Sequence, residues 1–444
     1  MPPTAALALA AALWLGSAAP APADTWSAPF RLAEPVSIDL LPAQIAFAPS
    51  GGAVIGFGEQ DEDQPAAAQA LIVSRPEHGR LAKPRPVPDA QAILDAGFDD
   101  GTLVLLTGTS EAGQACCSSA SVIAYAGGRF GRPQTVTGTL LAGATVGRLL
   151  VLPGHVKLAA IGTAAGVWVA QSGRAGGLTR PRRLTAASAS AQTLAASALS
   201  GRRSVVAWTA STGRPGAPNP RAIELAYGSA TRAPSRPRAA VVAARGHEVD
   251  ELQLAGGTLA WVESFYDGRG AYHSTVFAVD LSRAAGRPRP FAVSGQAAGL
   301  SLAADARGDA LLAFKACGQP GVCTVYAAGR AAGGRFDAPL ALGSIDASQA
   351  PAATVGASGE GLVGWIARGH VYAADRPPSA RLSRTAGGAS PRRGSSPFAR
   401  ARLVSAANYA ADVTLAFSPS GGALAAWTQG TLNPSVMGAV YRTG

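Results

Sequence analysis

Short apolar stretches alternate with glycine-bearing turns along almost the whole chain. In eight places a turn with a glycine separates two such stretches, as in IAFAPSGGAVIGF around Gly51 and VTLAFSPSGGALAAW around Gly421. The eight turn glycines, spaced 47 to 62 residues apart, are Gly51, Gly101, Gly154, Gly201, Gly256, Gly308, Gly359 and Gly421. Glycine tolerates the positive φ that a tight hairpin turn requires, so each unit predicts two antiparallel strands.

Each unit continues with a third apolar stretch, a Gly/Arg turn and a large residue followed by proline, as in VIAYAGGRFGRPQTV from Val122. Proline lacks an N–H group, which suits the start of an outer edge strand. Four strands in a repeat of this length are typical of a β-propeller blade. We therefore expect an all-β, single-domain propeller of eight four-stranded blades, or seven if the irregular unit around Gly154 is not a blade.

A bulky side chain recurs near the end of each second strand. These residues are Phe57, Leu106, Ile161, Trp208, Trp261, Phe314, Trp365 and Trp427. One large side chain at a fixed place in every repeat favours packing between blades over a row of ligand-stacking rings, because large apolar side chains dominate protein cores.

The two ends of the chain complement each other. The last unit stops at GAVYRTG, after three strands, whereas TWSAPFRL from Thr25 has the pattern of an isolated fourth strand. Pairing of the N-terminal strand with the last unit would complete a blade and close the ring, which leaves no open sheet edge.

The N-terminal segment has the pattern of a secretory signal peptide. Residues 5–15 are all apolar, and Ala21-Pro22-Ala23 matches an A-x-A cleavage site. We expect cleavage after residue 23, a propeller over residues 24–444 and a secreted, extracellular protein. The apolar stretch is shorter than a membrane span, and no later stretch is long enough, so no membrane span is expected.

The basic charge comes almost entirely from arginine. The net charge is +11, but only Lys83, Lys157 and Lys315 are lysines, and the arginines are scattered. For an exported chain this pattern argues against nucleic acid as a partner. Residues 376–402 are rich in Arg, Ser, Gly and Pro and are predicted to be a mobile insertion within the propeller that rests on anionic cell-surface polymers.

The repeat pattern, with its D/S-G turn, the second strand ending in Trp and the GGRFG.P segment, resembles the repeats of secreted bacterial β-propeller proteins. It is also distantly similar to the sialidase-like superfamily, whose blades carry an Asp-box of the form S/T-x-D-x-G-x-x-W. In SPSGGALAAW, Ser420 stands where the Asp-box aspartate belongs, and Trp427 comes later than its tryptophan. The resemblance therefore implies the propeller fold and does not extend to sialidase activity.

Four cysteines in an exported chain are read first as disulfides. Cys317 and Cys323 flank a Gly-Pro-Gly turn between two predicted strands, and we expect a bond between them. Cys116 and Cys117 are adjacent, so they form a strained vicinal disulfide, remain free thiols or bond to another chain; we favour the first. Four cysteines without a C-x-x-C pair and five dispersed histidines predict no metal site, and we expect no cofactor.

Loops between second and third strands emerge on one face of a propeller, where a binding site would be built. The loop ESFYDGRGAYHS of the fifth unit is the richest in chemistry. Its candidate ligand-binding residues are Glu263, Tyr266, Asp267, Arg269, Tyr272 and His273. The acidic loop from Glu59 to Asp63 lacks the spacing of a calcium loop, and an ordinary solvated loop is an open interpretation for both segments.

Two classes of function follow. The first is a binding or scaffold module that engages an extracellular protein or glycan through these loops. The second is an extracellular polysaccharide-acting enzyme, a glycoside hydrolase or lyase, for which a Glu and a Tyr in one loop could serve as acid and base. We favour binding over catalysis. The sequence identifies no catalytic residue and no oligomeric state.

Overall fold

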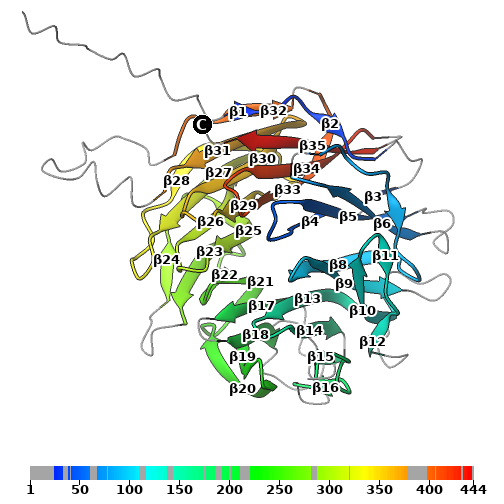
Figure 1. Ribbon diagram of the computed structural model, residues 1–444. Coiled ribbons are helices and arrows are strands. Elements are labelled where there is room, and N and C mark those ends of the chain that lie inside the picture. Colours follow the sequence, from blue (N-terminus) through cyan, green and yellow to red (C-terminus); the bar gives the residue numbers. More distant parts are fainter. Residues whose placement is uncertain are drawn as a thin grey trace, which may run out of the picture.

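In the computed structural model the chain forms a ring of β-sheets, as expected for a propeller (Figure 1). The described residues are 25–33, 39–40, 42–60, 68–77, 79–109, 117–137, 144–163, 165–173, 176–185, 193–199, 202–210, 221–281, 288–319, 321–378, 398–405, 407–431 and 434–442. The predicted signal peptide and most of residues 376–402 lie outside these ranges. The described residues form eight antiparallel sheets and no helix, so the eight-blade prediction is confirmed and the unit around Gly154 is a blade.

Every blade has four strand positions, counted outward from the axis of the ring. The first strands are β4 (Gln44–Phe47), β8 (Ala92–Asp99), β13 (Ala144–Leu152), β17 (Leu194–Leu199), β21 (His247–Ala255), β25 (Gln296–Ala304), β29 (Ala352–Val355) and β33 (Ala410–Phe417). The second strands are β5 (Ala53–Gln60), β9 (Thr102–Thr109), β14 (Val156–Thr163), β18 (Arg203–Ala210), β22 (Thr258–Tyr266), β26 (Ala310–Gln319), β30 (Gly361–Ala367) and β34 (Ala423–Gln429).

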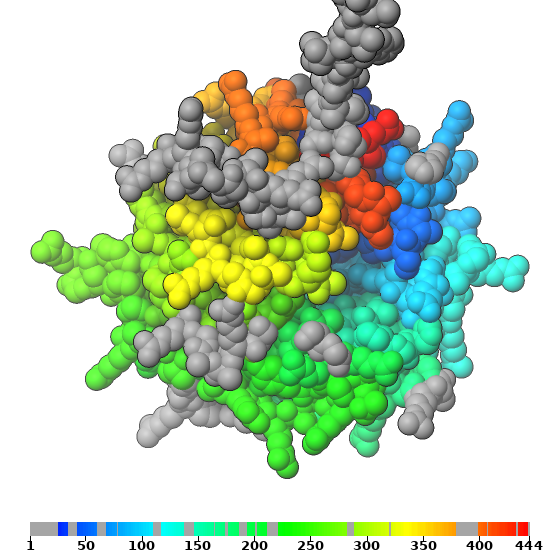
Figure 2. Space-filling model, turned by 60° about the vertical axis from the view of Figure 1, so that its left-hand side comes forward, coloured from blue at the N-terminus to red at the C-terminus, as the bar shows by residue number. Residues whose placement is uncertain are grey.

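The two outer positions follow in the same order around the ring. The third strands are β6 (Gln69–Arg75), β10 (Ser119–Ala126), β15 (Gly166–Gln171), β19 (Ala222–Ser229), β23 (Tyr272–Asp280), β27 (Val322–Arg330), β31 (His370–Arg376) and β35 (Ser435–Arg442). The outermost strands are β7 (Arg85–Pro86), β11 (Arg129–Phe130) with β12 (Gln134–Thr137), β16 (Arg182–Arg183), β20 (Arg232–Val242), β24 (Arg289–Phe291), β28 (Leu340–Ile345) and β32 (Arg402–Ser405). We number the blades 1 to 8 from β4 to β33. Figure 2 shows the ring turned so that blades 6 and 7, in yellow and orange, come forward.

The ring closes through the eighth blade. The N-terminal strands β1 (Thr25–Trp26) and β2 (Phe30–Arg31) both pair with β35 near the C-terminus. The backbone N–H of Leu32 donates to the carbonyl of Val436 at 2.7 Å. The short strand β3 (Asp39–Leu40) then leads into blade 1, where it pairs with β5. The closure predicted from the two chain ends is thus consistent with the observed pairing.

Glycines make the turns between first and second strands, as the repeat predicts. Gly51, with φ of 85°, connects β4 to β5, and Gly421, with φ of 95°, connects β33 to β34. Gly201 lies outside the described residues. A side chain at these positive φ values would strain the backbone, so the glycines fix the hairpin geometry.

The core consists of apolar layers between neighbouring blades. Each of the eight buried clusters combines residues of two adjacent blades. Trp208, Trp261, Trp365 and Trp427 are at most 2% exposed, so the recurring bulky residue packs between blades. One assignment is wrong by one position: Leu106 packs toward blade 3, whereas Leu105 faces blade 1. Successive strand residues face opposite sides, so this shift by one residue moves the side chain into the other layer.

Within the part of the chain that the structure describes, no helix is long and apolar enough to cross a membrane.

Candidate functional site

The predicted candidate residues lie at the end of blade 5 where β22 turns into β23. Three rings stack there across three adjacent strands: His247 of β21, Phe265 of β22 and His273 of β23 occupy one cross-strand row. The ring centroids of His247 and Phe265 are 4.2 Å apart, and those of Phe265 and His273 are 5.0 Å apart. This stack forms a rigid base beneath the turn, because each ring is fixed by the register of the sheet.

Each histidine of the stack contacts one of the predicted acidic residues. The Nδ1 atom of His247 is 2.7 Å from a carboxylate oxygen of Glu263, whose side chain is only 12% exposed. On the other strand, the Nε2 atom of His273 is 3.1 Å from the Oδ2 atom of Asp267. The two carboxylates are therefore paired with imidazoles.

Asp267 also shapes the turn. Its Oδ1 atom accepts hydrogen bonds from the backbone N–H groups of Arg269 and Ala271, at 2.8 and 2.9 Å. The hydrogen bond with His273, followed by these backbone donors, lowers the pKa of the Asp267 carboxyl below its usual value of 3.8. A carboxylate that accepts several hydrogen bonds keeps its charge, so this turn carries a fixed negative group at neutral pH.

An aromatic pair, one ring exposed and one half-buried, flanks the turn. Tyr266, which is 70% exposed, and Tyr272 face each other across the hairpin with ring centroids 5.2 Å apart at an angle of 59°. The hydroxyl of Tyr272 donates to the Oδ2 atom of Asp250 on β21 at 3.2 Å. Burial, the largest cause, raises the pKa of Tyr272, so its hydroxyl remains protonated at neutral pH and keeps its ability to donate.

The structure therefore brings all six predicted residues to one end of blade 5. Arg269 is exposed in the turn, and its backbone N–H donates to the carboxylate of Asp267. Three further participants, His247, Phe265 and Asp250, were not predicted from the sequence. The aromatic faces can pack against the apolar face of a ligand ring. The neighbouring carboxylate and hydrogen-bond donors can bind the hydroxyl groups of the same ligand. We call this group of residues the blade-5 cluster.

Other acidic residues near the axis connect blades. The carboxylate of Glu251 accepts hydrogen bonds from the backbone N–H groups of Gly299 and Leu300 in blade 6, at 2.8 and 2.6 Å. In the same way, the Oδ2 atom of Asp95 accepts from the N–H of Leu149 in blade 3 at 2.7 Å. These carboxylates satisfy backbone donors between blades, which is a structural role.

A second group of chemical interest lies at the Gly-turn ends of blades 2 and 3. One oxygen or nitrogen atom from each of Asp99, Asp100 and His155 lies within 4.8 Å of the others, a spacing that would suit a metal ion. However, the ammonium of Lys157 lies 2.7 Å from Asp99. Burial raises the pKa of Asp99, but the hydrogen bonds from Lys157 and His155 outweigh it, and the net pKa is lowered. The cluster is an ion-pair network with its own cation.

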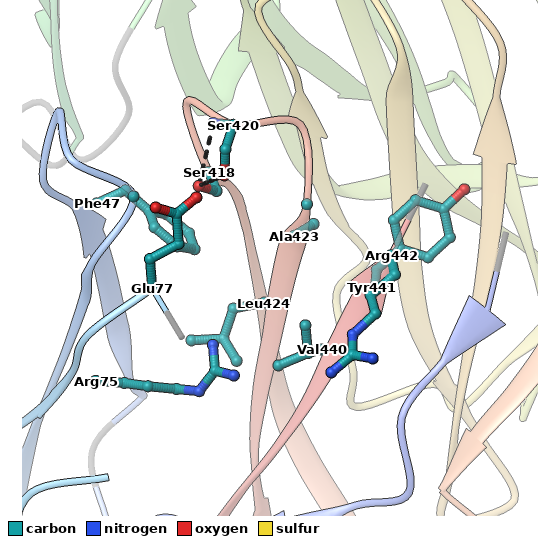
Figure 3. Close-up of a pocket in the computed structure, with 12 residues that line it drawn as sticks. Phe47, Arg75, Glu77, Ser418, Ser420, Ala423, Leu424, Val440, Tyr441 and Arg442 are labelled. Carbon is teal, nitrogen blue, oxygen red and sulfur yellow. Dashed lines mark hydrogen bonds between the residues drawn. The ribbon is translucent and has the colours of Figure 1, made fainter. Parts of the chain in front are cut away.

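A groove of about 530 Å³ runs along the closure of the ring, between blades 8 and 1 (Figure 3). Arg75, Glu77 and Arg442 line it together with Ser418 and Ser420, whose hydroxyls are 2.8 Å apart. Charges of both signs meet in this groove, so it does not select a ligand of one charge.

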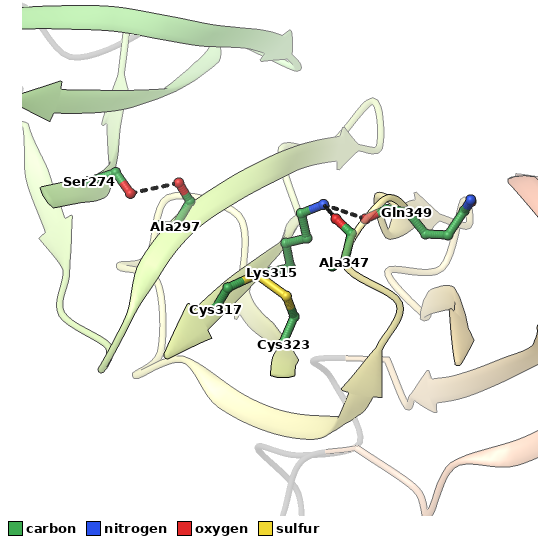
Figure 4. Close-up of a disulfide and its surroundings, with 7 residues drawn as sticks. All are labelled: Ser274, Ala297, Lys315, Cys317, Cys323, Ala347 and Gln349. Atoms are coloured by element: carbon green, nitrogen blue, oxygen red, sulfur yellow. Dashed lines mark hydrogen bonds between the residues drawn. A yellow bond between two sulfur atoms is a disulfide. The ribbon is translucent and has the colours of Figure 1, made fainter. Parts of the chain in front are cut away.

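The predicted disulfide between Cys317 and Cys323 is present and joins β26 to β27 at directly opposed positions (Figure 4). Beside it, the ammonium of Lys315 donates to the carbonyls of Ala347 and Gln349 and so ties blade 6 to the segment that leads into blade 7. Cys117 is buried and is not a free thiol. Cys116 lies outside the described residues, so its bond to Cys117 stays a prediction.

Two further loops of interest are described only in part. Burial raises the pKa of Glu59, at the end of β5, and the rest of the acidic loop to Asp63 lies outside the described residues. The corresponding loop of blade 4, residues 211–220, also lies outside them.

No family model matches the chain, and no curated protein matches it in sequence. Among solved structures, a protein of unknown function from Dyadobacter fermentans is 11% identical with a TM-score of 0.43, covering 95% of this chain and 100% of its own. An α-L-arabinanase from Penicillium chrysogenum is 11% identical with a TM-score of 0.44, at 94% and 98% coverage. A Trypanosoma rangeli sialidase is 9% identical with a TM-score of 0.35, at 71% and 56% coverage. The function is therefore argued from this chain's own residues.

Proposed function

We propose that this propeller is an exported binding module that engages an extracellular glycan through the blade-5 cluster. The observation that carries the proposal is the exposed ring of Tyr266, paired with the half-buried Tyr272, beside the fixed carboxylate of Asp267. The signal-peptide pattern and the Cys317–Cys323 disulfide support export, because disulfides persist in oxidising compartments.

In the proposed mode, a sugar ring packs its apolar face on Tyr266 while polar groups of the turn bind its hydroxyls. Asp267 offers acceptor oxygens and Arg269 offers donors, while His273 holds the Asp267 carboxylate in place. The stack of His247, Phe265 and His273 holds this constellation in place, so binding requires little ordering of the protein. A protein partner on the same surface is the alternative within the binding class.

The enzyme hypothesis is retained as a second candidate, on the basis of two carboxylates in one hairpin. Both are engaged by imidazoles, at 2.7 Å for Glu263 and 3.1 Å for Asp267. A glycoside hydrolase needs one carboxyl group that donates a proton and a second that acts as base or nucleophile. The lowered pKa of Asp267 leaves it only the base or nucleophile role. Because both carboxylates are already paired with imidazoles, binding is the better-supported function.

A glycan array probed with residues 24–444 in oxidised form tests the proposal. Tyr266→Ala should lower the affinity for the bound glycan at least about tenfold, because the ring supplies the packing surface. Tyr409→Ala removes another strongly exposed tyrosine, 65% exposed on blade 8, and should leave binding unchanged. Binding that survives both Tyr266→Ala and Tyr272→Ala would overturn the proposed site. Release of reducing ends from the bound glycan would favour the enzyme hypothesis.

A further inference from the structure

Blade 4 is strongly basic, and the function proposed for the blade-5 cluster does not involve these basic residues. The segment of blade 4, residues 193–245, contains a single acidic residue, Glu224. It contains eight arginines: Arg202, Arg203, Arg214, Arg221, Arg232, Arg236, Arg238 and Arg245. Figure 2 shows this green segment at the lower rim of the ring, with long side chains extending into solvent.

Two of these arginines line a groove between the outermost strands of blades 3 and 4. The groove has a volume of about 290 Å³, and its lining residues are Arg182, Arg183, Leu184, Arg232, Ser235, Arg236 and Pro237. The two strands that supply them, β16 and β20, lie at the lower rim in Figure 1. Four arginines and no acidic residue therefore line one cavity, and this excess of positive charge attracts anions.

The groove is held in shape by contacts of its own residues. The guanidinium of Arg182 on β16 donates to the carbonyls of Ala233 and Pro234 on β20, which ties the two blades together. Gly228 on β19 allows β20 to approach closely, because a Cβ atom there would lie 2.7 Å from the backbone nitrogen of Pro234. The guanidinium of Arg183 lies over the ring of Trp168 at 5.8 Å.

The arginines contributed by β20 are available to a ligand. Arg232, Arg236 and Arg238 are all exposed. Among the ion pairs of the described residues, none involves these three arginines. Charged residues on an outer strand also prevent sheets from joining edge to edge, but that role needs no groove and no charge on the neighbouring blade.

We propose that this groove binds an acidic polysaccharide through its carboxylate groups. Guanidinium forks match carboxylates in a two-point geometry, and the groove volume is close to the lower limit of typical small-ligand sites, enough for an acidic sugar unit. Single-stranded nucleic acids are bound largely by stacking on aromatic side chains, and no aromatic residue lines the groove. The surface is separate from the blade-5 cluster, so this inference does not depend on the proposed function.

Titration of the oxidised chain, residues 24–444, with an oligogalacturonate of defined length tests the inference. The double variant Arg232→Gln/Arg236→Gln should bind at least about tenfold more weakly at physiological ionic strength. The double lysine variant at the same positions keeps the charge but loses the fork, so its affinity should fall between the two. Arg335→Gln removes one charge from an exposed arginine outside the groove and should bind like the unmodified protein.

Three results would overturn the inference: no binding of oligogalacturonate by the unmodified chain at low salt, equal binding by the double glutamine variant, or tighter binding of a single-stranded oligonucleotide of the same charge. Unchanged thermal unfolding of the variants would show that the loss of affinity is not a loss of fold. The blade-5 variant Tyr266→Ala should keep the oligogalacturonate affinity, which separates this result from the test of the proposed function.

Discussion

Blades 4 and 5 are neighbours with the same four-strand plan, yet they differ strongly in charge. Blade 4 has eight arginines and one acidic residue, whereas residues 246–291 of blade 5 contain four arginines and six acidic residues, among them Glu263 and Asp267. The buried layer between them is apolar and includes Trp261. The comparison shows that the repeat fixes the layers between blades, while strand ends and outermost strands are free to carry different binding chemistry.

The largest effect on stability is expected in the apolar layer between blades 4 and 5. Trp261→Ala should lower the free energy of unfolding by about 3–5 kcal/mol, because it leaves a cavity between two blades. Chemical denaturation would measure this change, and both surfaces should lose their ligands together. Tyr266→Ala, at an exposed position, should change stability by less than about 0.5 kcal/mol. Equal stability of the two variants would contradict the layer model.

Substitution of one glycine in each blade compares the two blades more directly. Gly228→Ala places a Cβ against the backbone of Pro234, so it should displace β20 and lower the free energy of unfolding by about 1–3 kcal/mol. Gly268→Ala in the blade-5 turn meets open space and serves as the control. Denaturation together with oligogalacturonate titration would show a loss for the first variant only. A harmless Gly228→Ala would mean that the groove does not depend on this close approach.

The contribution of the Asp267 carboxylate to the stability of blade 5 should depend on pH. The pKa of Asp267 is lowered in the fold, so the contribution of its contacts is complete above the unfolded value of 3.8 and is lost as the pH falls through the lower, folded pKa. His273→Ala should raise the pKa of Asp267 toward 3.8. Carboxyl resonances followed by NMR during an acid titration would measure the shift. An unchanged Asp267 titration in this variant would contradict the proposed hydrogen bond.

In blade 4, the pKa of Tyr227 provides the corresponding test of the local charge. Burial raises the pKa of Tyr227 above its usual value of 10, and the charges of Arg238 and Arg203 act in the opposite direction. Arg238→Gln should therefore raise the Tyr227 pKa further, by a small amount because the phenol is 40% exposed. Ultraviolet titration of the phenol, with Tyr227→Phe to assign its signal, would detect this. A fall in the Tyr227 pKa would show that the arginines do not act on it.

The propeller could be predicted because its signals are local and repeat eight times. Glycine turns, apolar strands and the recurring tryptophans each specify one structural position, and only the one-residue assignment at Leu106 was wrong. The unmatched first and last strands likewise sufficed to predict ring closure.

The blade-5 cluster could be predicted only in part. Tyr266 and Tyr272 flank one turn, so their proximity follows from the hairpin. A regular hairpin around Gly256 and Gly257 would place His247 opposite Tyr266, but a bulge between Val249 and Glu251 shifts His247 opposite Phe265. A bulge inserts one residue without a clear sequence signal, so the histidine stack was missed. The groove of blade 4 was missed because Arg182 and Arg236 come from different repeats.

The central claim is that two neighbouring blades bind different ligands. A single array of neutral and acidic glycans, probed with the unmodified chain, Tyr266→Ala and Arg232→Gln/Arg236→Gln, tests it most directly. We predict that Tyr266→Ala loses a neutral glycan and keeps the acidic polysaccharide, while the double variant shows the reverse. Loss of both ligands in either variant, with the fold intact, or loss of neither, would contradict the account.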